Sequence, residues 1–137
     1  MFTHEEVISR LEEAGRTLLS LPPERAVGHC RTSIWEYVRE PVHSMALPRK
    51  FEPTPSAQEI SRMDEALRWP ALISADKFVM RRIVCARMLV SPRTGTHLFP
   101  WRRIGTLLGA DHKAVQRWHV QGIQFITASL QAQKRAA

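Results

Sequence analysis

Residues 101–120 read WRRIGTLLGADHKAVQRWHV, a short helical pattern followed by a glycine and a second helical pattern. In the first pattern Ile104 and Leu108 lie one helical turn apart, and Gly105 is a small residue between them. Gly109 follows at once, and glycine readily adopts the positive φ that a tight turn between helices requires. The stretch therefore predicts two helices joined by a sharp turn.

The second helix is predicted to begin at Asp111 and to run to about Gln131. Asp111 suits the N-cap because its carboxylate can accept a hydrogen bond from the first turn. Val115 and Trp118 are three positions apart, so we assign them to the inward face. Gly122 indicates a close helix approach or a bend. The outward face then carries His112, Lys113, Gln116, Arg117 and Val120.

A short helix, a glycine turn and a second helix form either a plain packing hairpin or the helix-turn-helix that binds DNA. The outward residue types favour DNA binding, because Arg and Lys read guanine and Gln reads adenine in the major groove. The candidates for holding phosphates precede the second helix: Arg93 and Thr94 in a loop, and Arg102 and Arg103 in the first helix.

The distribution of charge supports DNA binding. The 137 residues include 20 Lys and Arg against 13 Asp and Glu, a net charge of +7. Residues 1–70 carry nine basic and eleven acidic side chains, whereas residues 71–137 carry eleven basic and two acidic. The whole basic excess lies in the half that contains the helix pair, which is typical of proteins that bind a polyanion. A general solubility charge is the alternative.

The helix pair resembles the helix-turn-helix of sigma-factor region four and of phage regulators, whose pattern is W-x-x-I-A-x-x-L-G-x-S-x-x-T-V-x-R. The residues that carry this resemblance are Trp101, Ile104, Gly105, Leu107, Leu108, Gly109, Ala114, Val115 and Arg117. Gly105 replaces the usual alanine and Asp111 the usual serine, and each keeps the role of the residue it replaces. The segment LPPERAVG at 21–28 makes the whole chain resemble a family of unassigned function from phages and gene-transfer-agent-like prophages. This second resemblance implies a phage origin.

The rest of the chain also predicts helices and no strands, so we expect an all-α fold. The pairs Thr3 with Glu6 and Ser56 with Glu59 are capping boxes that open two helices. Pro22 ends the first helix, and the second extends up to Pro70.

A third helix is predicted from Ser74, with Phe78, Ile83, Ala86 and Leu89 pointing inward. The chain then divides into three parts. These are an N-terminal helix at 1–21, an irregular proline-rich arm or linker at 22–55, and a helical domain at 56–137 that contains the helix-turn-helix at 101–131.

Other chemistries find little support in the sequence. Cys30 and Cys85 form no CxxC pair, and His112 and His119 have no third ligand nearby, so no metal site is predicted. No nucleophile motif or phosphate-binding loop is present, so we predict no catalytic residue, no cofactor and no enzymatic activity. The chain has neither a membrane-length apolar run nor a signal-peptide pattern, so we expect a cytoplasmic protein without a membrane partner.

We therefore expect a phage- or prophage-encoded transcriptional regulator that binds specific sequences of double-stranded DNA. One alternative is the small subunit of a terminase, which recognises a DNA packaging site. A second alternative is a helical adaptor that binds a protein such as RNA polymerase. The helices at 3–20 and 56–69 each keep an apolar stripe, which favours a homo-oligomer, preferably a dimer. The other possibility is that both helices pack on the helix-turn-helix in one monomeric core.

Overall fold

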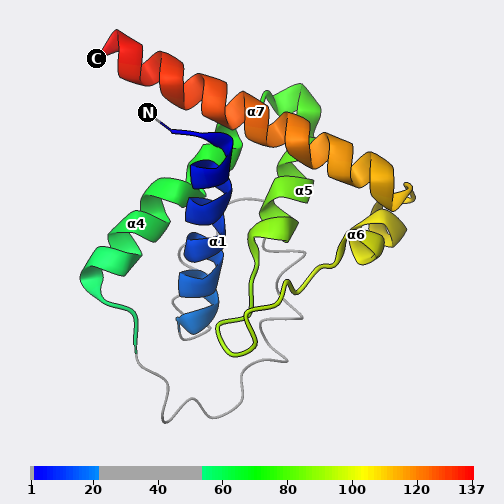
Figure 1. The fold of residues 1–137 in the computed structure, drawn as a ribbon, viewed down its shortest axis with the longest axis horizontal. Coiled ribbons are helices and arrows are strands. Elements are labelled where there is room, and N and C mark those ends of the chain that lie inside the picture. The colour runs from blue at the N-terminus through cyan, green and yellow to red at the C-terminus, as the bar shows by residue number, and fades with distance from the viewer. Residues whose placement is uncertain (1, 22–53) are drawn as a thin grey trace.

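A computed structural model describes residues 2–21 and 54–137 of the chain. The predicted arm at 22–55 therefore lies outside the described residues except for Thr54 and Pro55, and Cys30 lies outside them too. The helices are α1 (His4–Ser20), α4 (Ala57–Leu67), α5 (Phe78–Met88), α6 (Trp101–Leu108) and α7 (His112–Ala136) (Figure 1).

Two short 3-10 helices, η1 (Trp69–Leu72) and η2 (Ala75–Lys77), connect α4 to α5. The described residues contain no strand, only an isolated bridge between Val90 and His97. The all-α fold is therefore confirmed. Within the same residues, no helix combines the length and the apolar character needed to cross a membrane.

The helix starts follow the predicted capping signals. The Thr3 hydroxyl accepts a hydrogen bond from the Glu6 amide at 3.2 Å, and the Glu6 carboxylate accepts one from the Thr3 amide at 2.8 Å. The Ser56 hydroxyl likewise accepts from the Glu59 amide at 3.2 Å. Each bond satisfies an amide that has no partner within the helix, so these side chains fix where α1 and α4 begin.

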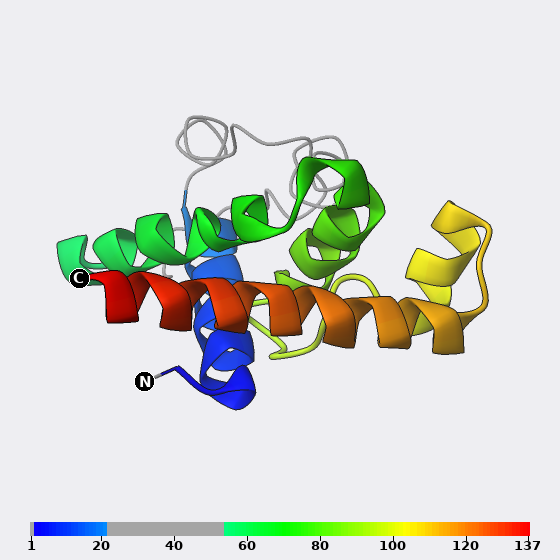
Figure 2. The ribbon, with the colours of Figure 1, turned by 90° about the horizontal axis from the view of Figure 1, so that it is seen from above.

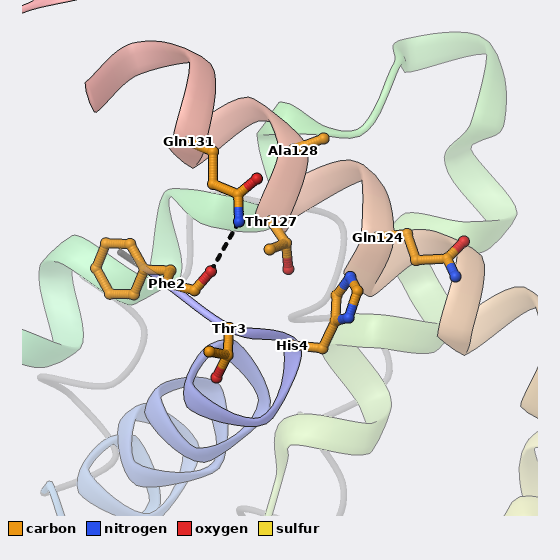
Figure 3. A pocket seen from close by; sticks show the side chains of 7 residues that line it. All are labelled: Phe2, Thr3, His4, Gln124, Thr127, Ala128 and Gln131. Atoms are coloured by element: carbon orange, nitrogen blue, oxygen red, sulfur yellow. Dashed lines mark hydrogen bonds between the residues drawn. The ribbon is translucent and has the colours of Figure 1, made fainter. Parts of the chain in front are cut away.

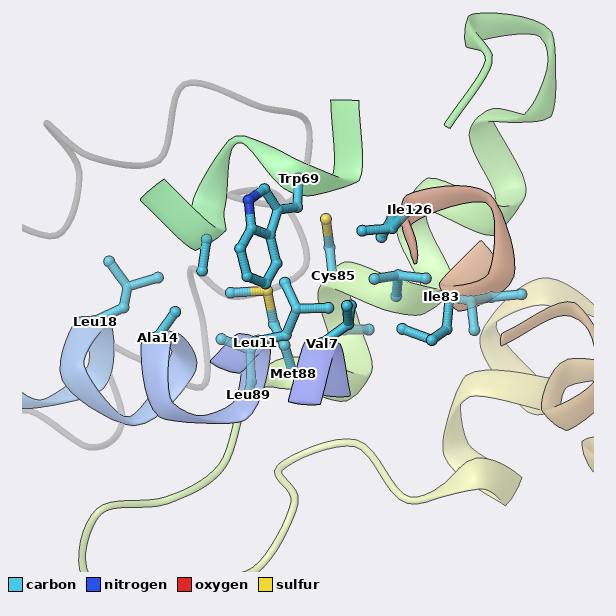
Figure 4. Close-up of a cluster of buried hydrophobic side chains, with 14 of the residues drawn as sticks. Val7, Leu11, Ala14, Leu18, Trp69, Ile83, Cys85, Met88, Leu89 and Ile126 are labelled. Atoms are coloured by element: carbon cyan, nitrogen blue, oxygen red, sulfur yellow. The ribbon is translucent and has the colours of Figure 1, made fainter. Parts of the chain in front are cut away.

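One hydrophobic core joins the helices of both halves of the chain. α1 packs against α4, α5 and α7 (Figures 1 and 2). Its apolar stripe is buried in this core, where it meets side chains from η1, α5 and α7 (Figure 4). The labelled members of the cluster include Val7, Leu11, Ala14, Leu18, Trp69, Ile83, Met88 and Ile126. The apolar stripe of α1, which favoured a homo-oligomer in the sequence, is therefore covered by other helices of the same chain.

Ion pairs hold α4 against α1 at the edge of this core. The Arg62 guanidinium donates two hydrogen bonds to the Glu13 carboxylate, at 2.9 and 3.0 Å, and Arg10 contacts Glu65 at 3.1 Å. The bond from Arg62 holds the pKa of Glu13 below its usual value. These carboxylates thus pair with arginines between the two helices.

The third predicted helix differs from expectation at its start. η2 follows Ser74, so α5 begins at Phe78. Phe78 is 53% exposed, so the prediction that it points inward is wrong. Its ring lies 5.2 Å from the Arg82 guanidinium, a contact that a first-turn position allows at the surface. The other three predicted inward residues are buried: Ile83, Ala86 and Leu89.

Gly122 marks the crossing of α5 and α7. A Cβ at this position would lie 2.8 Å from Val84 Cγ2 and 3.3 Å from Ile73 Cδ1. The absence of a side chain therefore lets the two helices approach closely, which is the first of the two alternatives that the sequence left open at this glycine. This crossing fixes the middle of α7 in the core while its N-terminal half extends toward α6 (Figure 1).

Candidate nucleic-acid interface

The turn between α6 and α7 has the predicted geometry. Gly109 caps α6 in the left-handed conformation, with φ 68° and ψ 33°. The Ala110 amide donates a hydrogen bond to the Gly105 carbonyl at 2.9 Å. A Cβ on Gly105 would lie 2.6 Å from the Ala110 carbonyl oxygen, so this position admits only glycine without a shift of the backbone. The two helices are therefore joined by a closed, tightly packed corner.

The inward face of this corner agrees with the sequence in part. Ile104 and Val115 are buried as predicted, and Leu108 is half-buried. Trp118 is also half-buried, so it lies at the edge of the interface. His119, one turn after Val115, fills the interior in its place.

His119 joins a small polar group beneath α6. Its ring lies edge-on to Trp101, with 5.1 Å between the ring centroids. The Arg87 guanidinium lies 4.1 Å from the centre of the Trp101 ring and donates a hydrogen bond to the Phe99 carbonyl at 3.2 Å. Burial, together with the charges of Arg87 and His97, lowers the pKa of His119 to about 4, so its ring is neutral at pH 7.

The predicted outward residues of α7 are accessible, with one exception. Lys113, Gln116, Arg117 and Val120 are exposed. His112 is half-buried, and its Nδ1 lies 3.4 Å from an Asp111 carboxylate oxygen. Asp111 occupies the N-cap position, but its side chain makes no capping hydrogen bond.

The exposed side chains continue along α7 beyond the predicted set. Lys113, Arg117, Val120 and Gln124 are all exposed and follow one another at helical spacings of four, three and four residues. We call these four residues the outer strip of α7. The outward face predicted from the sequence ends at Val120, one turn before Gln124.

The candidate phosphate contacts fall into two separate places. Arg102 and Arg103 are exposed on α6, beside the corner, and the Arg103 guanidinium lies 4.9 Å from the centre of the Phe99 ring. Arg93 and Thr94 lie in the loop between Val90 and His97, which lies beside α1 and away from α6 (Figures 1 and 2).

His97 holds this loop to α1. Its Nε2 lies 3.5 Å from a Glu12 carboxylate oxygen, and its Nδ1 lies 2.9 Å from the Arg87 carbonyl oxygen. The structure thus does not bring Arg93 and Thr94 together with the outward face of α7.

A pocket of about 380 Å³ lies where the outer strip meets the first turn of α1 (Figure 3). Thr3 and His4 line it from α1, and Gln124 and Thr127 line it from α7. The Gln131 side-chain amide donates a hydrogen bond to the Phe2 carbonyl at 3.1 Å, which fastens the start of the chain to α7. No local sequence motif signals this pocket, because its two walls come from opposite ends of the chain.

Within residues 2–21 and 54–137, no group of three or more His, Cys, Asp or Glu side chains is arranged to hold a metal ion. Apart from the Asp111 carboxylate and the His112 imidazole, the exposed polar side chains around the corner are cations, amides and hydroxyls. Groups of this kind donate hydrogen bonds to phosphate oxygens and to base edges.

Comparison with protein families gives a match over residues 19–126 to the family described as "Domain of unknown function (DUF6362)". The chain belongs to this family. The DUF6362 match includes all of α6 and the entire outer strip of α7, and it ends at Ile126. No curated protein and no solved structure matches the chain.

Proposed function

We propose that this DUF6362 protein binds double-stranded DNA through α6 and α7, with the start of α7 in the major groove. The closed corner at Gly105 supports the proposal most directly, because it joins two helices in the compact way that a helix-turn-helix requires. In such a unit the first turns of the second helix meet base edges while the first helix crosses the backbone. Lys113, Gln116 and Arg117 occupy those first turns and are exposed.

Each exposed side chain has a role that its chemistry suits. Arg117 and Lys113 would bind guanine or a phosphate, and Gln116 would bind adenine through its amide. Val120 would contact a thymine methyl group. Arg102 and Arg103 would hold phosphates, and His112 would add a polar contact at the helix start. Arg93 and Thr94 would not contact this DNA, because their loop lies beside α1 and away from α6 (Figure 1).

A salt titration tests DNA binding. Anisotropy of a labelled duplex should give a log–log slope of about −4 to −5 between ~50 and ~200 mM salt, as expected for ~4–6 neutralised phosphates. Lys113→Ala should weaken binding and flatten this slope. Lys134→Ala is the matched control, because Lys134 is exposed on the same helix at its other end. Absence of binding at low salt, or an affinity that ignores salt, would refute the proposal.

Within this proposal, a phage-derived transcriptional regulator is the favoured role. The mass of the protein in solution separates this role from that of a terminase small subunit. A monomer or dimer favours regulation, whereas a closed ring of many subunits favours DNA packaging.

A further inference from the structure

The outer strip of α7 is longer than the major groove of DNA is wide. Lys113 and Gln124 are eleven residues apart, which corresponds to about 16 Å along a helix. The major groove is about 12 Å wide. With Lys113 at the base edges and α7 inclined across the groove, Gln124 would lie beside the sugar–phosphate backbone at the groove edge.

The pocket between α1 and α7 opens at this end of the strip. The first turn of α1 emerges from beneath α7 on the side opposite to α4 and α5 (Figure 2). The imidazole of His4 is directed toward α7, between Thr127 and Gln124 (Figure 3). A duplex lying along the outer strip therefore meets this turn of α1.

The polar groups of the pocket suit a phosphate. Its polar lining consists of hydroxyls, amides and an imidazole, without a carboxylate. The nearby Glu6 carboxylate accepts the hydrogen bond from the Thr3 amide, so it is turned back into the cap of α1. His4 and Gln124 are both exposed, so their donor groups are accessible to a ligand.

We infer that this pocket receives a backbone phosphodiester of the bound duplex, held by His4 and Gln124, whose side chains lie beside each other in the pocket (Figure 3). The inference rests on the proposed function, since it takes α7 as the helix in the groove. It adds the start of α1 to the DNA-binding surface and assigns to it a contact with the backbone. Such a contact increases affinity for every sequence alike.

Alanine substitutions test the contact on a labelled duplex. His4→Ala and Gln124→Ala should each weaken binding several-fold on all sequences, with base preference unchanged. Gln121→Ala is the matched control, because Gln121 is exposed on α7 but lies off the outer strip. Equal binding by Gln124→Ala, His4→Ala and the wild type would overturn the inference.

A charge substitution gives an independent test that does not depend on removing a contact. Glu5 is exposed next to His4, so Glu5→Lys should tighten binding and steepen the salt slope by about 0.9 for one added phosphate contact. Glu59→Lys makes the same charge change in the first turn of α4 and should have a smaller effect. Glu5→Gln removes the negative charge without adding a positive one. The melting temperature of each variant shows whether its fold is retained.

The outcomes separate the two proposals. If the wild type binds the duplex and Arg117→Ala weakens it, but Glu5→Lys behaves like Glu59→Lys, the phosphate pocket is wrong and the proposed function stands. If the wild type does not bind duplex DNA, the proposed function fails and the pocket assignment fails with it.

Discussion

Gly105 and Ala110 approach so closely that a Cβ on Gly105 would lie 2.6 Å from the Ala110 carbonyl oxygen. The backbone hydrogen bond from the Ala110 amide to the Gly105 carbonyl holds the two residues in this position at 2.9 Å. The helix-turn-helix pattern that the sequence resembles has alanine where Gly105 stands. In this protein the replacement is not conservative, because the turn occupies the space that the alanine methyl would need.

Gly105→Ala should therefore destabilise the protein by about 1–3 kcal/mol, the usual cost of forcing an extra carbon into a packed site. The added methyl group should also push the turn away from α6 and weaken DNA binding. Urea unfolding and duplex binding measure the two effects. Thr106→Ala is the control, since Thr106 is the exposed neighbour. A Gly105→Ala protein as stable as this control would contradict the close contact between Gly105 and Ala110.

Base preference should depend on the start of α7. Gln116→Ala and Arg117→Ala should each cost about 1–3 kcal/mol of binding free energy and relax the preference at one position of the site. Arg102→Ala should weaken all sequences equally. All three side chains are exposed, so melting temperatures should change little. If Arg117→Ala left both affinity and preference intact, α7 would not present this face to DNA.

Stability should fall in acid because of His119. Its pKa is about 4 in the fold and about 6.5 when unfolded, so the unfolded chain binds the proton more tightly. The free energy of unfolding is therefore unaffected above pH ~6.5 and decreases as the pH falls toward ~4, by roughly 3 kcal/mol in the limit.

The measurement is urea unfolding across this pH range for the wild type and for His119→Leu, which cannot titrate at this position. Other groups contribute equally to both proteins, so the difference between the curves isolates His119. A difference that stays constant with pH would show that His119 is not held neutral beside Trp101.

A fragment that begins at Ser74 should not fold. It keeps α5, α6 and α7 but loses α1, which covers the buried side chains of α5 and α7. Circular dichroism should show no cooperative melting transition for the fragment, whereas the full chain melts cooperatively. A fragment that melts cooperatively as a monomer would mean that residues 74–137 form a domain of their own.

The sequence predicted the helices well because their signals are local. Capping residues, prolines and glycines act on their immediate neighbours, so the sequence predicts the starts of α1 and α4 and the turn at Gly109. At Gly122 the sequence left a close approach or a bend open, because the partners Val84 and Ile73 are distant in sequence. Phe78 was assigned wrongly because helical periodicity places a residue on a face without indicating whether another element covers it.

The site was less predictable than the fold because it depends on elements that are distant in sequence. Trp118 and His119 are adjacent, and the histidine is the more deeply buried because it faces Trp101 and side chains of α1 and α5. The place of Arg93 depends on the contact of His97 with Glu12. The pocket at His4 requires both ends of the chain, so no pattern within α7 could indicate it.

α7 is one uninterrupted helix from His112 to Ala136, and the same helix carries the exposed outer strip and the crossing with α5 at Gly122. A surface of this kind is ordered before any ligand arrives. Association would then involve little loss of backbone freedom, and the heat capacity change should match that of rigid surfaces coming together, without a component from coupled folding. Because the helix is continuous, a core substitution near Gly122 that tilts α7 would also change the positions of Lys113 and Arg117, although neither residue contacts the substituted site.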